Sequence, residues 1–232
     1  MFNFTGGMLT GAEIEKQIRK GRINISNYNP AQLNPNSYNL KLHPQLLVYK
    51  RGSDRSSILP SYRPGVSVEQ ADLHDNCNSD INRFETAISG VGNLSIINSL
   101  CIDPLDMKVP NETIEFSIPK EGYVLQPGVL YIGRTVERTS SDFYIPMING
   151  RSSGGRLGIS IHICAGFGDI GFDGTWTLEI TCVEPIRIYP YTEIAQVCYF
   201  KPVGKIGKLY RGRYFGQQDA TASRFYRPKE DY

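Results

Sequence analysis

The stretch that decides the fold is NGRSSGGRLGISIHICAGFGDIGFDGTWTLEITCVE, residues 149–184. It predicts a strand at 157–165, a loop rich in glycine and aspartate, and a second strand at 175–182. Neighbouring strand residues point to opposite faces, which separates Thr175, Thr177, Glu179 and Thr181 from Trp176, Leu178, Ile180 and Cys182. A glutamate in mid-strand is costly to bury unless it meets water or a ligand. Glu179 is therefore the first candidate for a functional residue.

A basic, hydroxyl-rich turn precedes these strands. It contains Arg151, Ser152, Ser153 and Arg156, with two glycines before the second arginine. Backbone N–H groups, hydroxyls and a guanidinium together can cradle a phosphate. The turn and the glutamate strand together indicate an active site that binds an anion.

Outside this stretch the sequence predicts a mainly β protein. Short apolar runs separated by turn residues recur from residue 114 onward, which is typical of a sandwich or barrel. The expected strands are at 38–42, 124–125, 130–136, 143–148, 186–189 and 193–200. One short helix is expected at 9–20, where Thr10 and Glu13 form a capping box.

Composition limits the classes of function. A chain of 232 residues with net charge +2 predicts one domain without the charge needed for bulk nucleic-acid binding. No apolar run is long enough to span a membrane, and 1–8 do not resemble a secretory signal. We therefore expect a cytoplasmic protein whose cysteines are reduced and buried; they are Cys77, Cys101, Cys164, Cys182 and Cys198.

Two regions depart from the strand pattern. Residues from about 51 to 113 are rich in polar and turn-forming types and predict an insertion whose role the sequence leaves open. From about residue 205 the chain is basic and polar, which predicts either a solvated tail or a flexible arm that closes over a polyphosphate.

Several motifs in their order along the chain resemble the dCTP deaminases of the dUTPase-like superfamily. They are LTGAEIEKQIRKGRI, NPNSYNLKL, RSSGGRLG, AGFGDIGFDG, TLEI, IYPYTEIAQ and GRYFGQQDATASR. The resemblance implies a distorted, jelly-roll-like β-barrel and a homotrimer with active sites between subunits. It implies hydrolysis of dCTP to dUTP and ammonia, in some relatives followed by hydrolysis of dUTP to dUMP and pyrophosphate.

The resemblance also assigns roles to residues. Glu179 would activate water and carry protons, Ser152 and the backbone of Ala165 would hold that water, and Arg156 would orient the site. The residues expected to bind the nucleotide are Arg151, Ser153, Asp169, Phe172, Trp176, Thr177, Tyr210, Arg213 and Gln217. Family members often have aspartate where this chain has Asn39, and the change removes a charge at that position.

Zinc chemistry is not expected. The signature of zinc deaminases, H-x-E followed by P-C-x-x-C, is absent, and His43, His74 and His162 are scattered. No metal held by protein ligands is predicted, and Mg²⁺ would arrive with the triphosphate. Two alternatives stay open: a dUTP diphosphatase, which has no need of a strand glutamate at C4, and a non-enzymatic, nucleotide-sensing trimer.

Overall fold

The computed structural model describes residues 6–50 and 104–228. Most of the predicted insertion at 51–113 therefore lies outside the described residues, as do Cys77 and Cys101. The chain divides into two units, and the fold below is that of the unit formed by 1–49 and 107–232.

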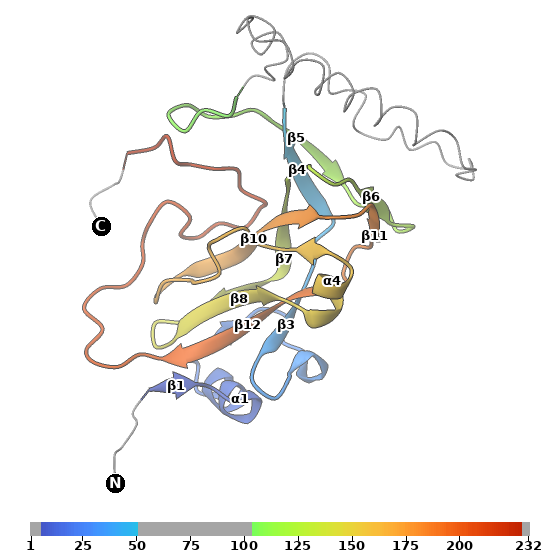
Figure 1. Cartoon of the computed structure of the whole chain (residues 1–232). Coiled ribbons are helices and arrows are strands. Elements are labelled where there is room, and N and C mark those ends of the chain that lie inside the picture. The colour runs from blue at the N-terminus through green and yellow to red at the C-terminus, as the bar shows by residue number, and fades with distance from the viewer. Residues whose placement is uncertain (1–5, 51–103, 229–232) are drawn as a thin grey trace, which may run out of the picture. The chain divides into compact units, whose positions relative to one another are not determined.

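The described elements are mainly strands, which confirms the predicted fold class (Figure 1). In chain order they are β1 (Gly7–Met8), α1 (Gly11–Arg19), β2 (Asn24–Ile25), the 3₁₀ turn η1 (Pro30–Gln32), β3 (Tyr38–Lys41), β4 (Gln45–Tyr49), β5 (Thr113–Ser117), β6 (Tyr123–Leu125), β7 (Tyr131–Ser140), β8 (Ile145–Gly150), α4 (Ser152–Arg156), β9 (Ile159–Ser160), β10 (Asp173–Cys182), β11 (Ile186–Ile188) and β12 (Glu193–Lys201).

The strands pair antiparallel in three sheets. One has the order β1-β12-β3 with β8 also on β12, a second has the order β5-β4-β7-β10-β9 with β2 on β7, and the third pairs β11 with β6. Among the described residues these sheets are open, so the expected closed barrel is not formed by backbone pairing. A single bridge between Leu42 and Thr135 joins the first two sheets.

The core lies between the sheets and is made of aliphatic and tyrosine side chains. Its fully buried members include Tyr38, Leu40, Leu46, Tyr131, Leu178, Ile180 and Tyr199. The expected alternation in β10 is confirmed from Trp176 onward, because Trp176, Leu178, Ile180 and Cys182 are buried while Thr177, Glu179 and Thr181 are partly exposed. Thr175, which was expected on the polar face, is buried, on the other side of a register shift between Thr175 and Thr177. The sequence period thus places Glu179 on the face opposite the core.

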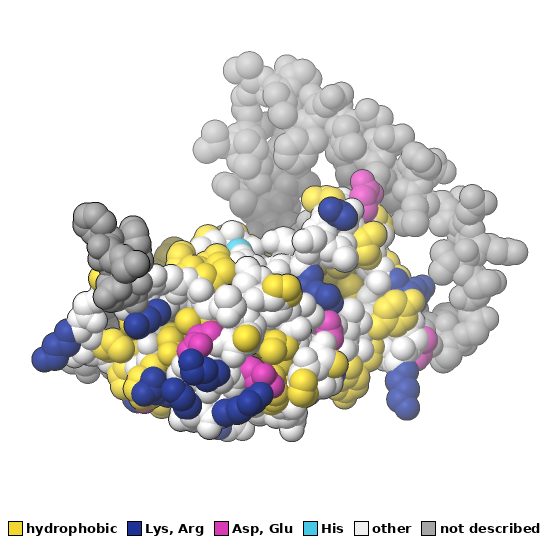
Figure 2. Space-filling model, turned by 90° about the horizontal axis from the view of Figure 1, so that it is seen from below, with side chains coloured by type: hydrophobic (Ala, Val, Ile, Leu, Met, Phe, Trp, Pro, Cys, Tyr) yellow, Lys and Arg dark blue, Asp and Glu magenta, His cyan; other side chains and the backbone are white. Residues whose placement is uncertain are grey.

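The helix and most predicted strands are found within a few residues of their expected bounds. Thr10 caps α1 by accepting from the Glu13 backbone N–H at 3.3 Å, which is one half of the predicted capping box. The Glu13 carboxylate accepts from the Lys16 and Gln17 side chains instead of reaching back to Thr10. Strand β4 was not predicted, and its pairing with β5 depends on residues far away in the sequence. Figure 2 shows that on the face carrying α1 basic and acidic side chains are interspersed.

The strand expected at 157–165 is wrong over most of its length. Residues 152–156 form the short helix α4, and only Ile159–Ser160 pair with β10. The rest of the stretch bends into a loop because Ile161 and Ile163 bond Glu179 instead of extending the ladder.

The described cysteines differ from each other in burial. Cys182 and Cys198 are buried, and burial raises the pKa of both thiols, so both remain protonated at neutral pH. Cys164 is exposed in the loop after β9, which corrects the expectation that it packs in a strand. No helix among the described residues has the length and hydropathy needed to cross a membrane.

Candidate active site around strand β10

Glu179 is fixed by the loop that follows β9. Its backbone N–H donates to the Ile161 carbonyl at 2.8 Å, and its Oε2 accepts from the Ile163 N–H at 2.8 Å. A carboxylate held by a backbone donor has a defined direction. The remaining oxygen, Oε1, accepts no hydrogen bond from the described residues, which leaves Glu179 able to receive a proton from a bound molecule.

A β-bulge beside Glu179 shapes the strand. One residue of β10, Trp176, faces three residues of β7, and the Trp176 N–H donates to the Thr135 hydroxyl at 2.9 Å. The Trp176 ring is buried, and its Nε1 donates to the Thr139 hydroxyl at 2.9 Å. Trp176 therefore has a structural role through both donors, and a predicted contact to the base would fall to its carbonyl.

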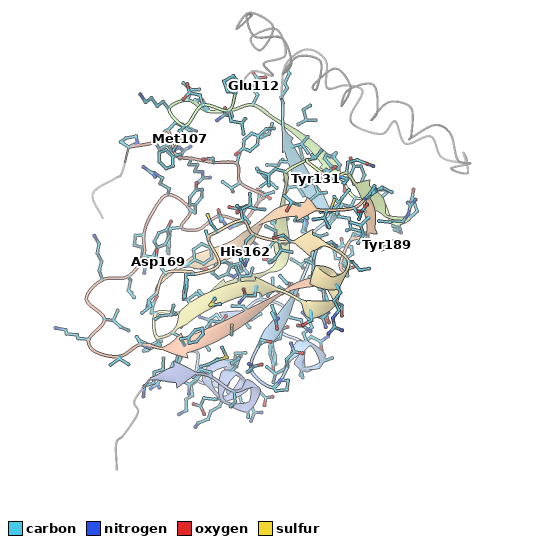
Figure 3. The ribbon with its side chains drawn as sticks, in the orientation of Figure 1. Met107, Glu112, Tyr131, His162, Asp169 and Tyr189 are labelled. Atoms are coloured by element: carbon cyan, nitrogen blue, oxygen red, sulfur yellow. The ribbon has the colours of Figure 1, made fainter. Side chains whose placement is uncertain are left out.

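The predicted sugar-binding residues lie on the loop between β9 and β10 (Figure 3). This loop is held against β8, because Ile148 donates to the Gly166 carbonyl at 2.7 Å and Gly168 donates to the Pro146 carbonyl at 2.9 Å. A side chain at Gly168 would place its Cβ 2.3 Å from the Trp176 ring, so only glycine fits there. Asp169 follows directly and is exposed.

Phe172 is buried at the end of this loop. Its ring lies 4.7 Å from that of Trp176 and 6.2 Å from that of Tyr210, measured between centroids. Ala165 is exposed at the start of the loop, two residues after Ile163. The loop thus carries Ala165 and Asp169 on its surface and Phe172 beneath it.

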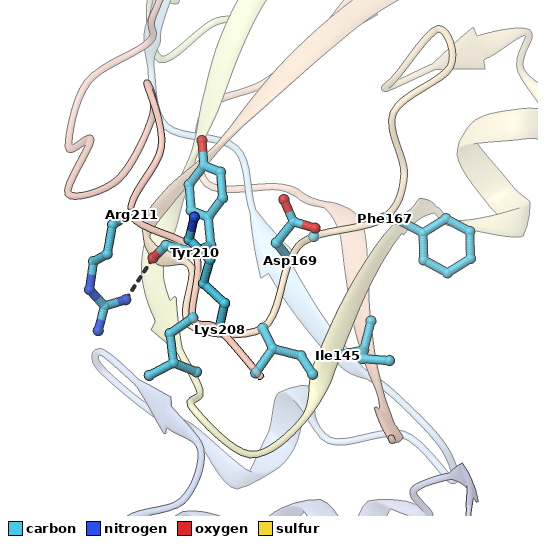
Figure 4. Close-up of a pocket in the computed structure, with 9 residues that line it drawn as sticks. Ile145, Phe167, Asp169, Lys208, Tyr210 and Arg211 are labelled. Atoms are coloured by element: carbon cyan, nitrogen blue, oxygen red, sulfur yellow. Dashed lines mark hydrogen bonds between the residues drawn. The ribbon is translucent and has the colours of Figure 1, made fainter. Parts of the chain in front are cut away.

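Asp169 and Tyr210 line a pocket of about 610 Å³ between this loop and the C-terminal segment. Sequence reasoning missed its other polar members, Lys208 and Arg211. Figure 4 shows Asp169 and Tyr210 projecting to the same side, whereas Arg211 turns away and donates to the Tyr210 carbonyl at 2.6 Å. A second bond, from Arg211 to the Gly171 carbonyl at 2.9 Å, ties the segment to the loop.

The C-terminal segment lies along β10 and is bonded to it. Gln217 is buried, and its Nε2 donates to the Thr175 carbonyl at 2.8 Å and to the Thr177 hydroxyl at 3.2 Å. The Gln217 Oε1 is buried without a partner among the described residues. Gln217 is therefore two positions from Glu179 along the polar face of β10, through Thr177.

Arg213, predicted to bind phosphate, contacts only its own segment in the described residues. Its Nη2 donates to the Arg227 carbonyl at 2.6 Å, its guanidinium lies over the Phe225 ring, and its Nε is buried without a partner. The structure therefore brings Gln217 to β10, whereas the Arg213 side chain makes no hydrogen bond to β10 among the described residues. A phosphate contact by Arg213 stays a prediction.

The predicted phosphate turn lies in and before α4. Ser152, Ser153 and Arg156 are exposed, and no hydrogen bond or ion pair of their side chains is found within 6–50 and 104–228. None of them is bonded to Glu179 within one chain. Arg151 precedes the helix, and its Nη1 donates to the Glu193 carboxylate at 3.0 Å and to the Glu193 carbonyl at 3.1 Å.

Large apolar side chains are exposed around this turn. Leu157, Ile163 and Val183 are 61%, 63% and 73% exposed. Metal ligands are not gathered: the described residues contain no group of three His, Cys, Asp or Glu side chains that could hold a metal ion. The site is therefore built from carboxylates that are not clustered, together with hydroxyls, backbone groups and guanidinium groups.

Comparison with known proteins identifies the family of the chain. The model of the dCTP deaminase-like family matches residues 8–81 and 96–202, leaving only 82–95 between the two matched stretches. These ranges cover much of the stretch for which the sequence predicts an insertion.

Relatives are similar over nearly their full length. A protein of Clostridium botulinum (strain Alaska E43 / Type E3) named dCTP deaminase, dUMP-forming, is 40% identical over 223 residues, covering 96% of this chain and 99% of that protein. A protein of the same name from Cytophaga hutchinsonii is 39% identical with the same coverage.

A solved structure is also similar. It is that of 2'-deoxycytidine 5'-triphosphate deaminase from Agrobacterium tumefaciens, with a TM-score of 0.49 and 20% identity, and the match covers 85% of this chain and 49% of that one. The family model and the relatives, which extend across both the β10 glutamate and the α4 turn, show that the chain belongs to the dCTP deaminase-like family.

Proposed function

We propose that the protein hydrolyses dCTP to dUTP and ammonia, with Glu179 as the group that moves protons. The observation that carries the proposal is the half-buried Glu179 carboxylate, held by the Ile163 N–H on a polar strand face in a chain of this family. Relatives named dCTP deaminase, dUMP-forming, support the choice of substrate.

The proposed steps balance with one water. Glu179 takes a proton from water, the resulting hydroxide adds to C4 of cytosine, and Glu179 passes the proton to N3. Glu179 then moves the proton of the new C4 hydroxyl to the amino group, so that the C4–N bond breaks, ammonia leaves and the C4 oxygen becomes the uracil carbonyl. General acid–base catalysis of this kind contributes about 10²–10⁴ in rate. Ser152 and the Ala165 backbone would hold the water, and Arg156 would stabilise the charge on the intermediate.

The substrate would be bound by groups on both sides of Glu179. Thr177 and the Trp176 carbonyl would face the base, Asp169 and Phe172 the deoxyribose, and Arg151, Ser153, Tyr210, Arg213 and Gln217 the triphosphate. Mg²⁺ would be bound to the triphosphate as part of the substrate. The deamination itself is proposed to proceed without zinc.

We further assign a second step to the same site, hydrolysis of dUTP to dUMP and pyrophosphate. The names of the relatives, which include the words dUMP-forming, support this second activity. A homotrimer with sites between subunits is proposed as well. Its support is the exposed Leu157, Ile163 and Val183 beside a turn that makes no bond to Glu179 within its own chain.

One experiment tests the proposed function. Purified protein is incubated with dCTP and Mg²⁺, and dUTP, dUMP and ammonia are separated and quantified, with dUTP as substrate in a parallel reaction. We expect equal amounts of ammonia and deoxyuridine nucleotides, with dUMP as the end product. Ammonia with only dUTP would remove the second step, and dUMP formed only from added dUTP would favour the dUTP diphosphatase.

A further inference from the structure

Two motifs of the chain remain without a function once the site is assigned. They are the turn NPNSYN at 34–39 and the strand start TEIAQ at 192–196. Both lie in the sheet that ends at Gly150, the residue before Arg151, because β12 pairs with β3 on one side and β8 on the other. Their polar side chains form a connected set of hydrogen bonds that ends at the phosphate turn.

The first branch of this set ends on the Arg151 guanidinium. Arg151 Nη1 donates to the Glu193 Oε2 at 3.0 Å and to the Glu193 carbonyl at 3.1 Å. The same Oε2 accepts from the Asn39 Nδ2 at 2.8 Å, and the Asn39 Oδ1 accepts from the Asn34 Nδ2 at 2.7 Å. A register shift between Glu193 and Ala195, with an extra residue in β12, lies beside Glu193. Bulges of this kind re-aim side chains.

The second branch ends on the backbone of the preceding residue. The Ser37 hydroxyl donates to the Gln196 Oε1 at 2.7 Å, and the Gln196 Nε2 donates to the Gly150 carbonyl at 3.0 Å. Ser37 and Asn39 are both buried, at 4% exposure, so these bonds are shielded from water. The two branches together fix both the backbone and the side chain at the entry to the turn.

The bonds leave one edge of Arg151 open. A guanidinium has five N–H donors, and Nη1 carries two of them. Both of these are directed at Glu193, while Nε and Nη2 make no bond within the described residues, and the side chain is 37% exposed. The edge formed by Nε and Nη2 can bind a phosphate with two parallel hydrogen bonds.

We propose that Glu193, supported by Asn39 and Asn34, is a positioning residue that holds Arg151 by one nitrogen so that its other edge binds the triphosphate. This inference rests on the proposed function. It also gives Asn39 a role: its amide donates to Glu193 while accepting from Asn34, which an ionised carboxylate cannot do. A bare surface ion pair would contribute little, but Glu193 is bonded to a buried amide.

The test is a double-mutant cycle on anion binding. Glu193→Leu removes the acceptor, Glu193→Gln keeps an acceptor and removes the charge, and each is made in the parent and in Arg151→Met. The probe is inorganic tripolyphosphate, whose Kd is measured by calorimetry. A matched control is Glu15→Leu, which breaks the exposed Glu15–Arg19 ion pair of α1.

We expect Glu193→Leu to raise the tripolyphosphate Kd about tenfold and Glu193→Gln to raise it less than about threefold, since the bond itself is lost only in the first. In the Arg151→Met background, Glu193→Leu should change Kd less than about twofold. Equal effects in both backgrounds, or no effect in a folded Glu193→Leu variant, overturn the inference.

The outcome is independent of turnover. If the parent protein deaminates dCTP and Glu193→Leu leaves tripolyphosphate binding unchanged, the positioning role fails and the proposed function stands. If the parent releases no ammonia but the cycle shows coupling, the proposed reaction fails and the positioning role stands. A parent that binds no tripolyphosphate overturns the positioning role in either case.

Discussion

The polar face of β10 and the turn at α4 are the two halves of the proposed site, and the chain holds them in different ways. Glu179 and Thr177 are each bonded within the chain, to Ile163 and Gln217, and are partly covered. Ser152 and Arg156 are exposed and make no side-chain bond within the described residues.

The difference matches the chemistry that each half would perform. A group that moves protons must keep one direction toward the reacting atoms, so it benefits from fixed neighbours. Ser152 and Arg156, which are proposed to hold the water and to stabilise the intermediate, act only when the nucleotide is bound, so they can remain open to solvent until it arrives. We therefore expect substitutions on β10 to affect rate, substitutions at the turn to affect activity without affecting stability, and substitutions under the turn to affect stability.

The largest expected effect is in the fixed half. Glu179→Gln keeps the shape of the side chain but cannot accept a proton, so ammonia release from dCTP should fall by about 10²–10⁴. The Kd for dCTP should change by less than about threefold. Ammonia is measured under single-turnover conditions, with the exposed Glu184→Gln as control. Near-normal turnover in Glu179→Gln would remove this residue from the mechanism.

The next effect concerns the C-terminal segment after Lys208, which lies along β10 and forms a cover over it. Ala220 packs in a buried cluster with Leu47 and Ile132, and Gln217 is bonded to β10. Deleting the chain after Lys208 should therefore raise the KM for dCTP at least about tenfold, as charge-assisted contacts are lost, and should also lower the Tm.

Arg156→Met is the matched change in the open half. It should lower activity without lowering the Tm, because surface substitutions usually change stability by less than about 0.5 kcal/mol. Activity assays and thermal scans on both variants give the comparison. If truncation leaves the Tm unchanged, the cover is not part of the folded body.

A third substitution tests the support beneath the turn. Asn39→Asp would place a carboxylate against the Glu193 carboxylate, where the amide now donates at 2.8 Å. The free energy of unfolding should fall by about 1–3 kcal/mol, the cost of losing a buried donor, as measured by urea denaturation. Adding Glu193→Gln should restore most of it, because the new amide can donate to the carboxylate introduced at position 39. A lack of rescue would show that the Asn39–Glu193 contact is not the cause.

The smallest expected effect is a pH dependence of stability that arises at His43. Burial, and then the charge of Arg134, lower the pKa of His43, whose two ring nitrogens lie 2.8 Å from the Arg134 Nη2 and 3.1 Å from the Gln45 N–H nitrogen. His43 and Arg134 line a second pocket, whose other charged groups are Glu115 and Asp219.

The direction of this change in stability follows from the number of protons that the folded and unfolded states bind. The unfolded state binds a proton near pH 6.5, above the pKa of His43 in the folded state, so stability falls as the pH drops below about 6.5. Between pH 7.5 and 5.5 this should lower the Tm by no more than about 4 °C, and His43→Gln should remove that share of the slope. A slope identical in both proteins would contradict the assignment.

The sequence predicts those parts of the fold and site that depend on local patterns. The alternation of β10, the capping box at Thr10 and the strands after residue 114 all follow from side-chain periods and turn residues. Glu179 could be found because an ionisable residue interrupts a strand. These features need no knowledge of distant partners.

The remaining features depend on contacts between distant segments. The loop at 161–165 replaces a predicted strand because its backbone bonds Glu179, sixteen to eighteen residues away in the sequence. Strand β4 is defined by its pairing with β5 across the stretch at 50–112. The role of Glu193 depends on Asn39, which is 154 residues away. No local pattern contains this information.

The bulge beside Glu179 has a consequence for insertions and deletions. Between the pairs Thr175–Arg138 and Thr177–Arg134, β7 has two more residues than β10. Because side chains alternate between the two faces of a sheet, a surplus of two residues keeps each side chain on its own face. A change of one residue would move all side chains in one half of the strand to the opposite face. Length variation at this point among homologous chains should therefore occur in steps of two. A single-residue deletion in β7 should leave the polar face of β10 paired with the wrong face of β7.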